Sequence, residues 1–154
     1  MTDISRGKGS ILIMTWNVNG LRMRKRQREI SQSLQDSGVH ICILQETHLL
    51  LQESKRLFSS WKWVYKAVST DQLVTSKGVS ILVRKGLGIE LVDSRVDQSG
   101  RWVIAKLLYK STTFTCVGYY GPNQDDPAPL QSLEGNLLDF PAPLIVGGDF
   151  NVLM

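Results

Sequence analysis

The chain has 154 residues, of which 42% are hydrophobic and 21% are charged, as in ordinary globular domains. A single domain of this length can bury roughly 70% of its unfolded surface, so its core needs neither disulfides nor a structural metal. This composition excludes a disordered chain, a collagen and a disulfide scaffold. The longest apolar runs have four residues, far short of the roughly 20 that span a bilayer. Segment 1–10 is polar and carries no apolar secretory signal, so we expect an intracellular protein with no membrane segment.

Strands and helices alternate in the first part of the predicted order. The continuous apolar run at 11–17 is typical of a strand buried on both faces, and residues 24–37 have helical periodicity that ends at Gly38. Residues 40–46 predict a second buried strand, and residues 52–58 predict a short helix. The opening of the chain therefore has the order strand, helix, strand, helix.

From residue 61 onward the pattern indicates strands. They are expected at 61–67, 78–84, 89–92, 102–109, 112–120 and 143–151. Only Lys110 and Ser111 separate two of them, which predicts a hairpin. A loop at 121–129 and a helix up to about Phe140 precede the last strand. This order indicates one α/β or α+β domain in which helices pack outside β-sheets. Cys42 and Cys116 fall inside apolar runs and are expected to be core thiols.

Polar side chains stand at the ends of three apolar strands. Asn17 and Asn19 close the first, Glu46 closes the second, and Asp149 and Asn151 close the last. Residues two apart on an extended strand project to the same side, so each pair is expected to share a side. Oxygen ligands of this kind suit Mg²⁺ or Mn²⁺. Taken singly, a strand-end carboxamide more often caps a turn, and a lone glutamate more often faces solvent.

Six segments stand in the order and rough spacing of one known family. They are TWNVNGLR (15–22), LQETHL (44–49), KGVSILVRKG (77–86), GRWV (100–103), YYGPN (119–123) and GGDFN (147–151). The chain resembles the endonuclease/exonuclease/phosphatase family, and within it looks most like the endonuclease domain of LINE-type retrotransposons. The resemblance covers residues 11–154 and implies a four-layer sandwich of two mixed β-sheets flanked by helices, with 1–10 as a tail.

The resemblance also implies a Mg²⁺ site, with Mn²⁺ as the alternative ion. Its ligands would come from Asn17, Glu46, Asp149 and Asn151, with Glu46 as the principal one. Asp149 would orient or deprotonate the attacking water, and Asn151 would hold that water and a phosphate oxygen.

The same resemblance implies residues that contact the substrate. Tyr120 would contact the scissile phosphate through its hydroxyl and counts with Asp149 and Asn151 as catalytic. Asn19, Arg22 and Asn123 would bind the DNA strand.

The family's domain normally continues past the GGDFN segment to a late Asp and a terminal Asp–His pair. The only histidines of the chain are His40 and His48, and neither has that context. His40 is expected to be structural and His48 to lie at the margin of the site. We therefore expect a domain that is incomplete at its C-terminus, whose last strand lacks partners and whose nuclease activity is weak or absent.

Several functions remain open at this point. The first is a magnesium-dependent phosphodiesterase that nicks DNA. The second, which we favour for the 154-residue chain, is a catalytically dead retrotransposon-derived DNA-binding remnant, once fused to a reverse transcriptase. An apurinic-site endonuclease or exonuclease of DNA repair and a phosphoinositide phosphatase share the fold.

A basic cluster bears on the partner. Five of the seven residues from 22 to 28 are basic, and the net charge is +4, which suits a polyanion such as DNA. The cluster is equally compatible with a helix that contacts the phosphates of DNA and with a nuclear localisation signal. A solvent-exposed helix face is the plainer interpretation.

Overall fold

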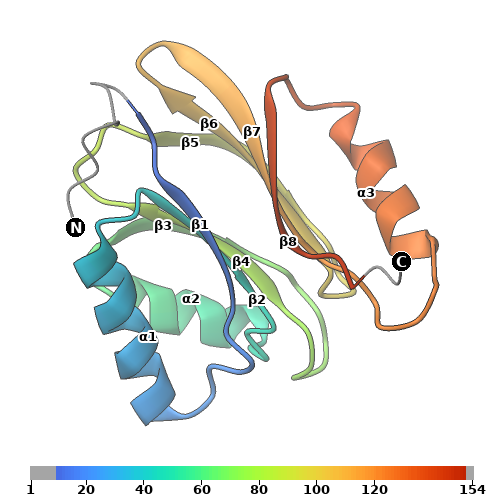
Figure 1. Cartoon of the computed structure of the whole chain (residues 1–154), viewed down its shortest axis with the longest axis horizontal. Coiled ribbons are helices and arrows are strands. Elements are labelled where there is room, and N and C mark those ends of the chain that lie inside the picture. Colours follow the sequence, from blue (N-terminus) through green and yellow to red (C-terminus); the bar gives the residue numbers. More distant parts are fainter. Residues whose placement is uncertain (1–9, 152–154) are drawn as a thin grey trace.

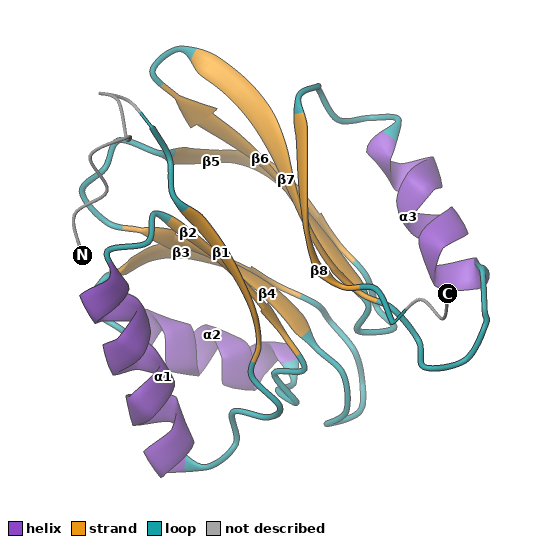
Figure 2. Ribbon diagram, in the orientation of Figure 1, coloured by secondary structure: helices purple, strands orange, loops and turns teal. Residues whose placement is uncertain are grey.

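The structure, a computed structural model, describes residues 10–151. Two β-sheets pack face to face, with α1 and α2 on the outer face of one sheet and α3 on the outer face of the other (Figure 1). Helices thus form the two outside layers and strands the two inside layers (Figure 2). This arrangement confirms the four-layer sandwich. The predicted tail at 1–10 lies, apart from its last residue, outside the described residues.

The first sheet combines parallel and antiparallel pairs in the order β1-β2-β4-β3. Its strands are β1 (Ile13–Asn17), β2 (Ile41–Gln45), β3 (Val64–Ser69) and β4 (Val79–Arg84). β1 and β2 are parallel and are joined by α1 (Arg24–Ser37), whereas β4 is antiparallel to both β2 and β3. The helix α2 (Leu51–Ser60) follows β2. The carboxyl ends of β1 and β2 therefore lie side by side.

The second sheet has the order β5-β6-β7-β8. Its strands are β5 (Glu90–Val96), β6 (Trp102–Tyr109), β7 (Thr112–Tyr120) and β8 (Leu144–Asp149). β7 and β8 are parallel and are connected through α3 (Ala128–Leu137), while the other pairs are antiparallel. The second sheet is thus also mixed, and the ends of β7 and β8 meet at one edge.

Local signals set several element boundaries as the sequence predicts. The helix α1 covers the expected residues and ends at Gly38, whose φ of 67° is the left-handed conformation typical of a helix C-cap. Lys110 and Ser111 have φ values of 48° and 65°, so they form the two-residue turn whose twist matches the β6–β7 hairpin.

The first strand differs from its prediction. Side chains on both faces of β1 pack against apolar clusters, Met14 and Trp16 toward the helices and Ile13 toward the other sheet. They are only partly buried, however, because β1 is an edge strand of its sheet among the described residues. A continuous apolar run thus indicated contacts on both faces but not a central position.

Two glycines let the sheets approach closely. Gly118 of β7 and Gly147 of β8 are partners in the strand register. A Cβ atom on Gly118 would lie 2.7 Å from Val79 Cγ1, and one on Gly147 would lie 2.8 Å from Ile43 Cδ1. Interiors are packed closely enough that such added carbons would force the layers apart. The short distance between the sheets therefore depends on these two positions.

β8 is an edge strand in the part of the chain that the structure describes. Leu144, Ile145 and Val146 are 46%, 36% and 44% exposed, because among the described residues β8 is paired on one side only, with β7. An unpaired apolar edge favours association with other chains. Between residues 10 and 151, none of the helices has the length and apolar character needed to cross a membrane.

Candidate functional site

Three strand ends from the two sheets converge on one cluster. Asn17 ends β1, Glu46 follows β2 and Asp149 ends β8. The Asn17 amide nitrogen donates to Glu46 Oε2 at 2.5 Å and to Asp149 Oδ2 at 3.2 Å. One carboxamide thus links two carboxylates that are carried by different sheets. We name Asn17, Glu46 and Asp149 the strand-end cluster.

The predicted partners Asn19 and Asn151 lie beyond the ends of the strands. Asn19 donates its backbone N–H to Asn17 Oδ1 at 3.0 Å, and Asn151 donates its backbone N–H to Asp149 Oδ1 at 3.2 Å. Their φ values are 50° and 48°, so extended geometry does not continue through either pair. The expectation that each pair shares a side because of strand alternation is wrong: both pairs form Asx turns instead.

Glu46 itself adopts a left-handed backbone conformation, with φ of 53°. For a residue with a Cβ atom this costs about 1–2 kcal/mol, and such residues gather at functional sites. The segment that carries it is held in place, because Thr47 donates its N–H to the Gly78 carbonyl at 3.1 Å and Gly78 donates to that of Gly100 at 3.1 Å. The KGVS and GRWV segments therefore position the QETH segment.

Tyr120 places a hydroxyl beside the cluster. It ends β7, pairs with Asp149 in the register and is 8% exposed. Burial is the main cause that raises its pKa, and the negative charge of Glu46 and a hydrogen bond to that carboxylate raise it further. The phenol therefore stays protonated and can donate a hydrogen bond.

Arg101 is a neighbour of this site to which the sequence analysis gave no role. Its guanidinium lies 5.1 Å from the centre of the Tyr120 ring, and its Nη1 donates to the Tyr120 carbonyl at 3.4 Å. It also opposes the rise in the pKa of Tyr120. Two signals could have singled it out: its place in the GRWV segment, and the hairpin register that pairs Trp102 with Tyr119 and so sets Arg101 opposite Tyr120.

A basic cavity of about 350 Å³ lies next to the cluster, lined among others by Arg22, Arg26 and His48. Arg22 is paired with Glu53 at 2.7 Å yet remains about half exposed, and Arg26 donates to the Val18 carbonyl at 3.1 Å. His48 Nε2 lies 3.8 Å from Glu46 Oε1, so the histidine stands at the margin of the site. Asn19 also lines this cavity.

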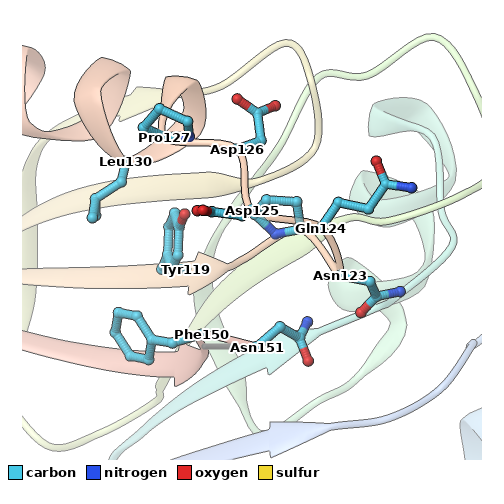
Figure 3. A pocket seen from close by; sticks show the side chains of 10 residues that line it. Tyr119, Asn123, Gln124, Asp125, Asp126, Pro127, Leu130, Phe150 and Asn151 are labelled. Carbon is cyan, nitrogen blue, oxygen red and sulfur yellow. The ribbon is translucent and has the colours of Figure 1, made fainter. Parts of the chain in front are cut away.

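Asn123 and Asn151 lie on the other side, in a cavity beside α3 (Figure 3). Asn151 Nδ2 donates to the Gly121 carbonyl at 2.8 Å. Of the four predicted metal ligands, hydrogen bonds join Asn17, Glu46 and Asp149, whereas the Asn151 side chain holds the YGPN segment.

The donor set of the strand-end cluster fits a hard cation. Two carboxylates meet there, held by the NH2 group of Asn17, whose Oδ1 accepts from Asn19. Mg²⁺ binds proteins through one or two carboxylates while it keeps several waters. Nowhere in residues 10–151 do three Asp, Glu, His or Cys side chains gather in a metal-binding arrangement. A cation at this cluster would therefore keep part of its water shell.

Comparison with known proteins places most of the chain in one family. The model described as the Endonuclease/Exonuclease/phosphatase family matches residues 14–153. The Transposon TX1 uncharacterized 149 kDa protein of Xenopus laevis is 26% identical over 92% of this chain, and the Exodeoxyribonuclease of Bacillus subtilis is 29% identical over 91% of it. The chain spans 11% of the first relative and 58% of the second.

Solved structures share the fold. The structure of D. rerio TDP2 complexed with single strand DNA product matches 94% of this chain, with a TM-score of 0.69 and 19% identity, and 62% of that chain is covered. The human Nocturnin catalytic domain with bound sulfate matches 92%, with a TM-score of 0.66 and 17% identity, and 65% of that chain is covered.

Proposed function

This chain belongs to the endonuclease/exonuclease/phosphatase family, and we propose that it forms the metal-binding part of a magnesium-dependent phosphodiesterase that nicks DNA, of the LINE-type endonuclease kind. The observation that carries this proposal is the strand-end cluster, in which Asn17 joins Glu46 and Asp149 across two sheets. The transposon relative supports the LINE-type assignment. On this proposal the domain works within a longer polypeptide that includes a reverse transcriptase, and it acts in the nucleus.

Each residue of the site has a distinct task in this proposal. Glu46 and Asp149 would hold Mg²⁺, or Mn²⁺, with Asn17 and Asn151 completing its surroundings. The bound ion would stabilise negative charge on the scissile phosphate. Asp149 would accept a proton from the attacking water, and the protonated hydroxyl of Tyr120 would donate to a phosphate oxygen.

The 154 residues alone are expected to bind the ion but to nick DNA slowly or not at all. Phosphodiester cleavage needs a donor for the charge that develops on the phosphate, and groups that act as a unit lose most of the rate when one is removed. Neither histidine of the chain is expected to be this donor. His40 accepts the backbone N–H of Leu12 at 2.6 Å in a structural role, and His48 stands at the margin of the site.

Magnesium-dependent nicking of supercoiled plasmid tests the catalytic proposal. We expect activity to appear when the C-terminal segment of a LINE-type homologue is fused after Met154, and Asp149→Ala to abolish it in that fusion. Asp93→Ala, at an exposed carboxylate in the middle of β5, is the matched control. A fusion that nicks equally well with Asp149→Ala would overturn the role of the cluster.

The basic face of α1 is proposed to attract the DNA backbone. Arg24, Lys25 and Arg28 are exposed, and contacts of lysine and arginine with phosphate release counterions and make affinity depend steeply on salt. Replacing these three residues with Gln should weaken DNA binding and flatten its dependence on log salt by up to about three units.

A control separates this effect from net charge. Replacing the exposed Lys62, Lys66 and Lys85 with Gln removes the same charge from outside α1 and should change the salt slope less. Equal slopes for both triple variants would show that α1 has no special part in DNA binding.

The relative named Exodeoxyribonuclease favours a second candidate, a repair-type exonuclease or apurinic-site endonuclease. Duplexes with an abasic site, duplexes with a free end and a phosphoinositide, offered to the same fusion, distinguish these activities from plasmid nicking. A DNA-binding remnant without catalysis is the outcome if none of these substrates is cleaved by the fusion.

A further inference from the structure

A cavity of about 420 Å³ opens between the loop after β7, the start of α3 and the end of β8 (Figure 3). Its walls are apolar: Tyr119, Leu130 and Phe150 line it, with prolines of the loop. The Tyr119 and Phe150 rings lie with centroids 5.2 Å apart at 37°. Phe150 and Leu130 are 42% and 41% exposed. The cavity therefore presents aromatic and aliphatic surface that a planar group can cover.

The polar side chains around this cavity are acidic or amide. Asp125 and Asp126 contribute two negative charges, Asn123 and Gln124 contribute amides, and the lining includes no basic residue. Asp126 already accepts the backbone N–H of Ala128 at 3.0 Å, whereas the Asp125 side chain points toward Tyr119 across the cavity (Figure 3). Such a rim disfavours a phosphate and favours a neutral group that carries N–H donors.

The cavity adjoins the strand-end cluster. Asn151 lines the cavity, and its backbone N–H donates to Asp149 of the cluster at 3.2 Å. The basic helix α1 lies in the opposite outer layer from α3, with both sheets between them (Figure 1). A DNA strand at the cluster would thus meet basic residues on one side and this acidic, aromatic cavity on the other.

We propose that this cavity is a nucleobase subsite that takes one unpaired base of the DNA strand bound at the strand-end cluster. The inference rests on the proposed action on DNA and adds a site that reads a base. Aromatic side chains bind bases by stacking on their faces. The Watson–Crick edge of guanine presents two adjacent N–H donors, which match one carboxylate, so guanine should bind best, with Asp125 as its acceptor.

Equilibrium binding of labelled single strands to the full chain, measured by fluorescence anisotropy in EDTA, tests the proposal without cleavage. A tetrahydrofuran residue, which keeps the phosphates but lacks a base, replaces each nucleotide in turn. We expect affinity to fall about tenfold, or ~1.4 kcal/mol, at one position. Phe150→Ala should bind the intact strand about as weakly as the wild type binds the base-free strand. Removing the base at that position should not weaken the binding of this variant further. Leu138→Ala, an 86% exposed leucine away from the cavity, should behave as wild type.

Base identity tests the role of Asp125. At the sensitive position, inosine in place of guanosine removes one N–H donor group and should weaken binding several-fold in the wild type. Asp125→Asn should bind the two strands equally. An undiminished preference in Asp125→Asn would overturn the assignment of this carboxylate.

Failure of this inference differs from failure of the proposed function. Salt-dependent binding that is insensitive to base removal at every position would overturn the base subsite and leave the DNA proposal standing. The base subsite would also be overturned, and the DNA proposal left standing, if Phe150→Ala lowers the affinity for intact and base-free strands equally while its melting temperature matches that of the wild type. If no strand binds even at low salt, both proposals are wrong.

Discussion

Replacing Gly118 by Ala should separate the two sheets and disturb the strand-end cluster. The new Cβ atom would lie 2.7 Å from Val79 Cγ1 and 2.9 Å from Ile43 Cγ2, about 1 Å inside an ordinary carbon contact. Both neighbours are fully buried and β-branched, with stiff χ1 angles, so they cannot turn away. We expect the free energy of unfolding to fall by about 1–3 kcal/mol.

The same separation should weaken metal binding. The Asn17–Asp149 hydrogen bond, at 3.2 Å, is the cluster's link between the sheets, and a shift of several tenths of an ångström takes it beyond hydrogen-bonding range. Asp149 would then lose its fixed position relative to Glu46. We expect Mn²⁺ to bind several-fold more weakly to Gly118→Ala than to the wild type.

Thermal unfolding and Mn²⁺ titration check the two effects separately. At about 2–4 °C per kcal/mol for a chain of this size, the midpoint should fall by about 2–12 °C. Gly135→Ala is the matched control, because a Cβ atom at this α3 position meets nothing within 4 Å, and it should stabilise the helix by about 1 kcal/mol. A Gly118→Ala protein with wild-type stability, or one with lowered stability but unchanged Mn²⁺ affinity, would refute this reasoning.

Three further predictions follow from burial and charge. Burial raises the pKa of both Cys42 and Cys116 from 9.0 to about 12. As the pH rises, these thiols therefore ionise at a lower pH in the unfolded chain than in the folded protein. Stability should fall above pH 9, by about 1.4 kcal/mol per thiol at pH 10. Chemical denaturation at about pH 8 and about pH 10 should show a smaller fall for Cys42→Ala, and an equal fall would be contrary evidence. Glu46→Gln should weaken Mn²⁺ binding at least tenfold in a calorimetric titration while the fold persists, and unchanged affinity would remove Glu46 from the metal site. Val146→Lys places a charge on the exposed edge of β8 and should reduce self-association in gel filtration, whereas an unchanged elution profile would show that this edge does not mediate it.

Local chemistry explains which parts of the fold were predictable from the sequence. Gly38 marks a helix end through its own backbone preference, and the two-residue gap between the runs at 102–109 and 112–120 marks a hairpin, so both could be placed to the residue. Burial of β1 depends instead on which strands pair with it, and a run of apolar residues does not predict strand pairing. Its edge position therefore had to come from the structure.

The candidate site shows the same division. Glu46 and Asp149 could be singled out because polar residues that close apolar strands are visible in the sequence, and Asn17 joined them in the structure as expected. The turns at Asn19 and Asn151 follow the plainer interpretation of a strand-end carboxamide, whereas strand alternation failed because it assumes that extended backbone continues past the strand end. Arg101 was missed although the predicted two-residue hairpin, continued from Trp102 opposite Tyr119, places it opposite Tyr120.

The link between Asn17 and Asp149 spans 132 positions of the chain, against 29 between Asn17 and Glu46. Closing so long a loop is slow and comes late relative to local structure. During synthesis, β1, α1 and β2 can form while β8 is still unmade, but the second carboxylate arrives only when residue 149 has left the ribosome. Until then a nascent chain carries only half of the proposed cation site, so on this proposal tight cation binding would report that both sheets have docked.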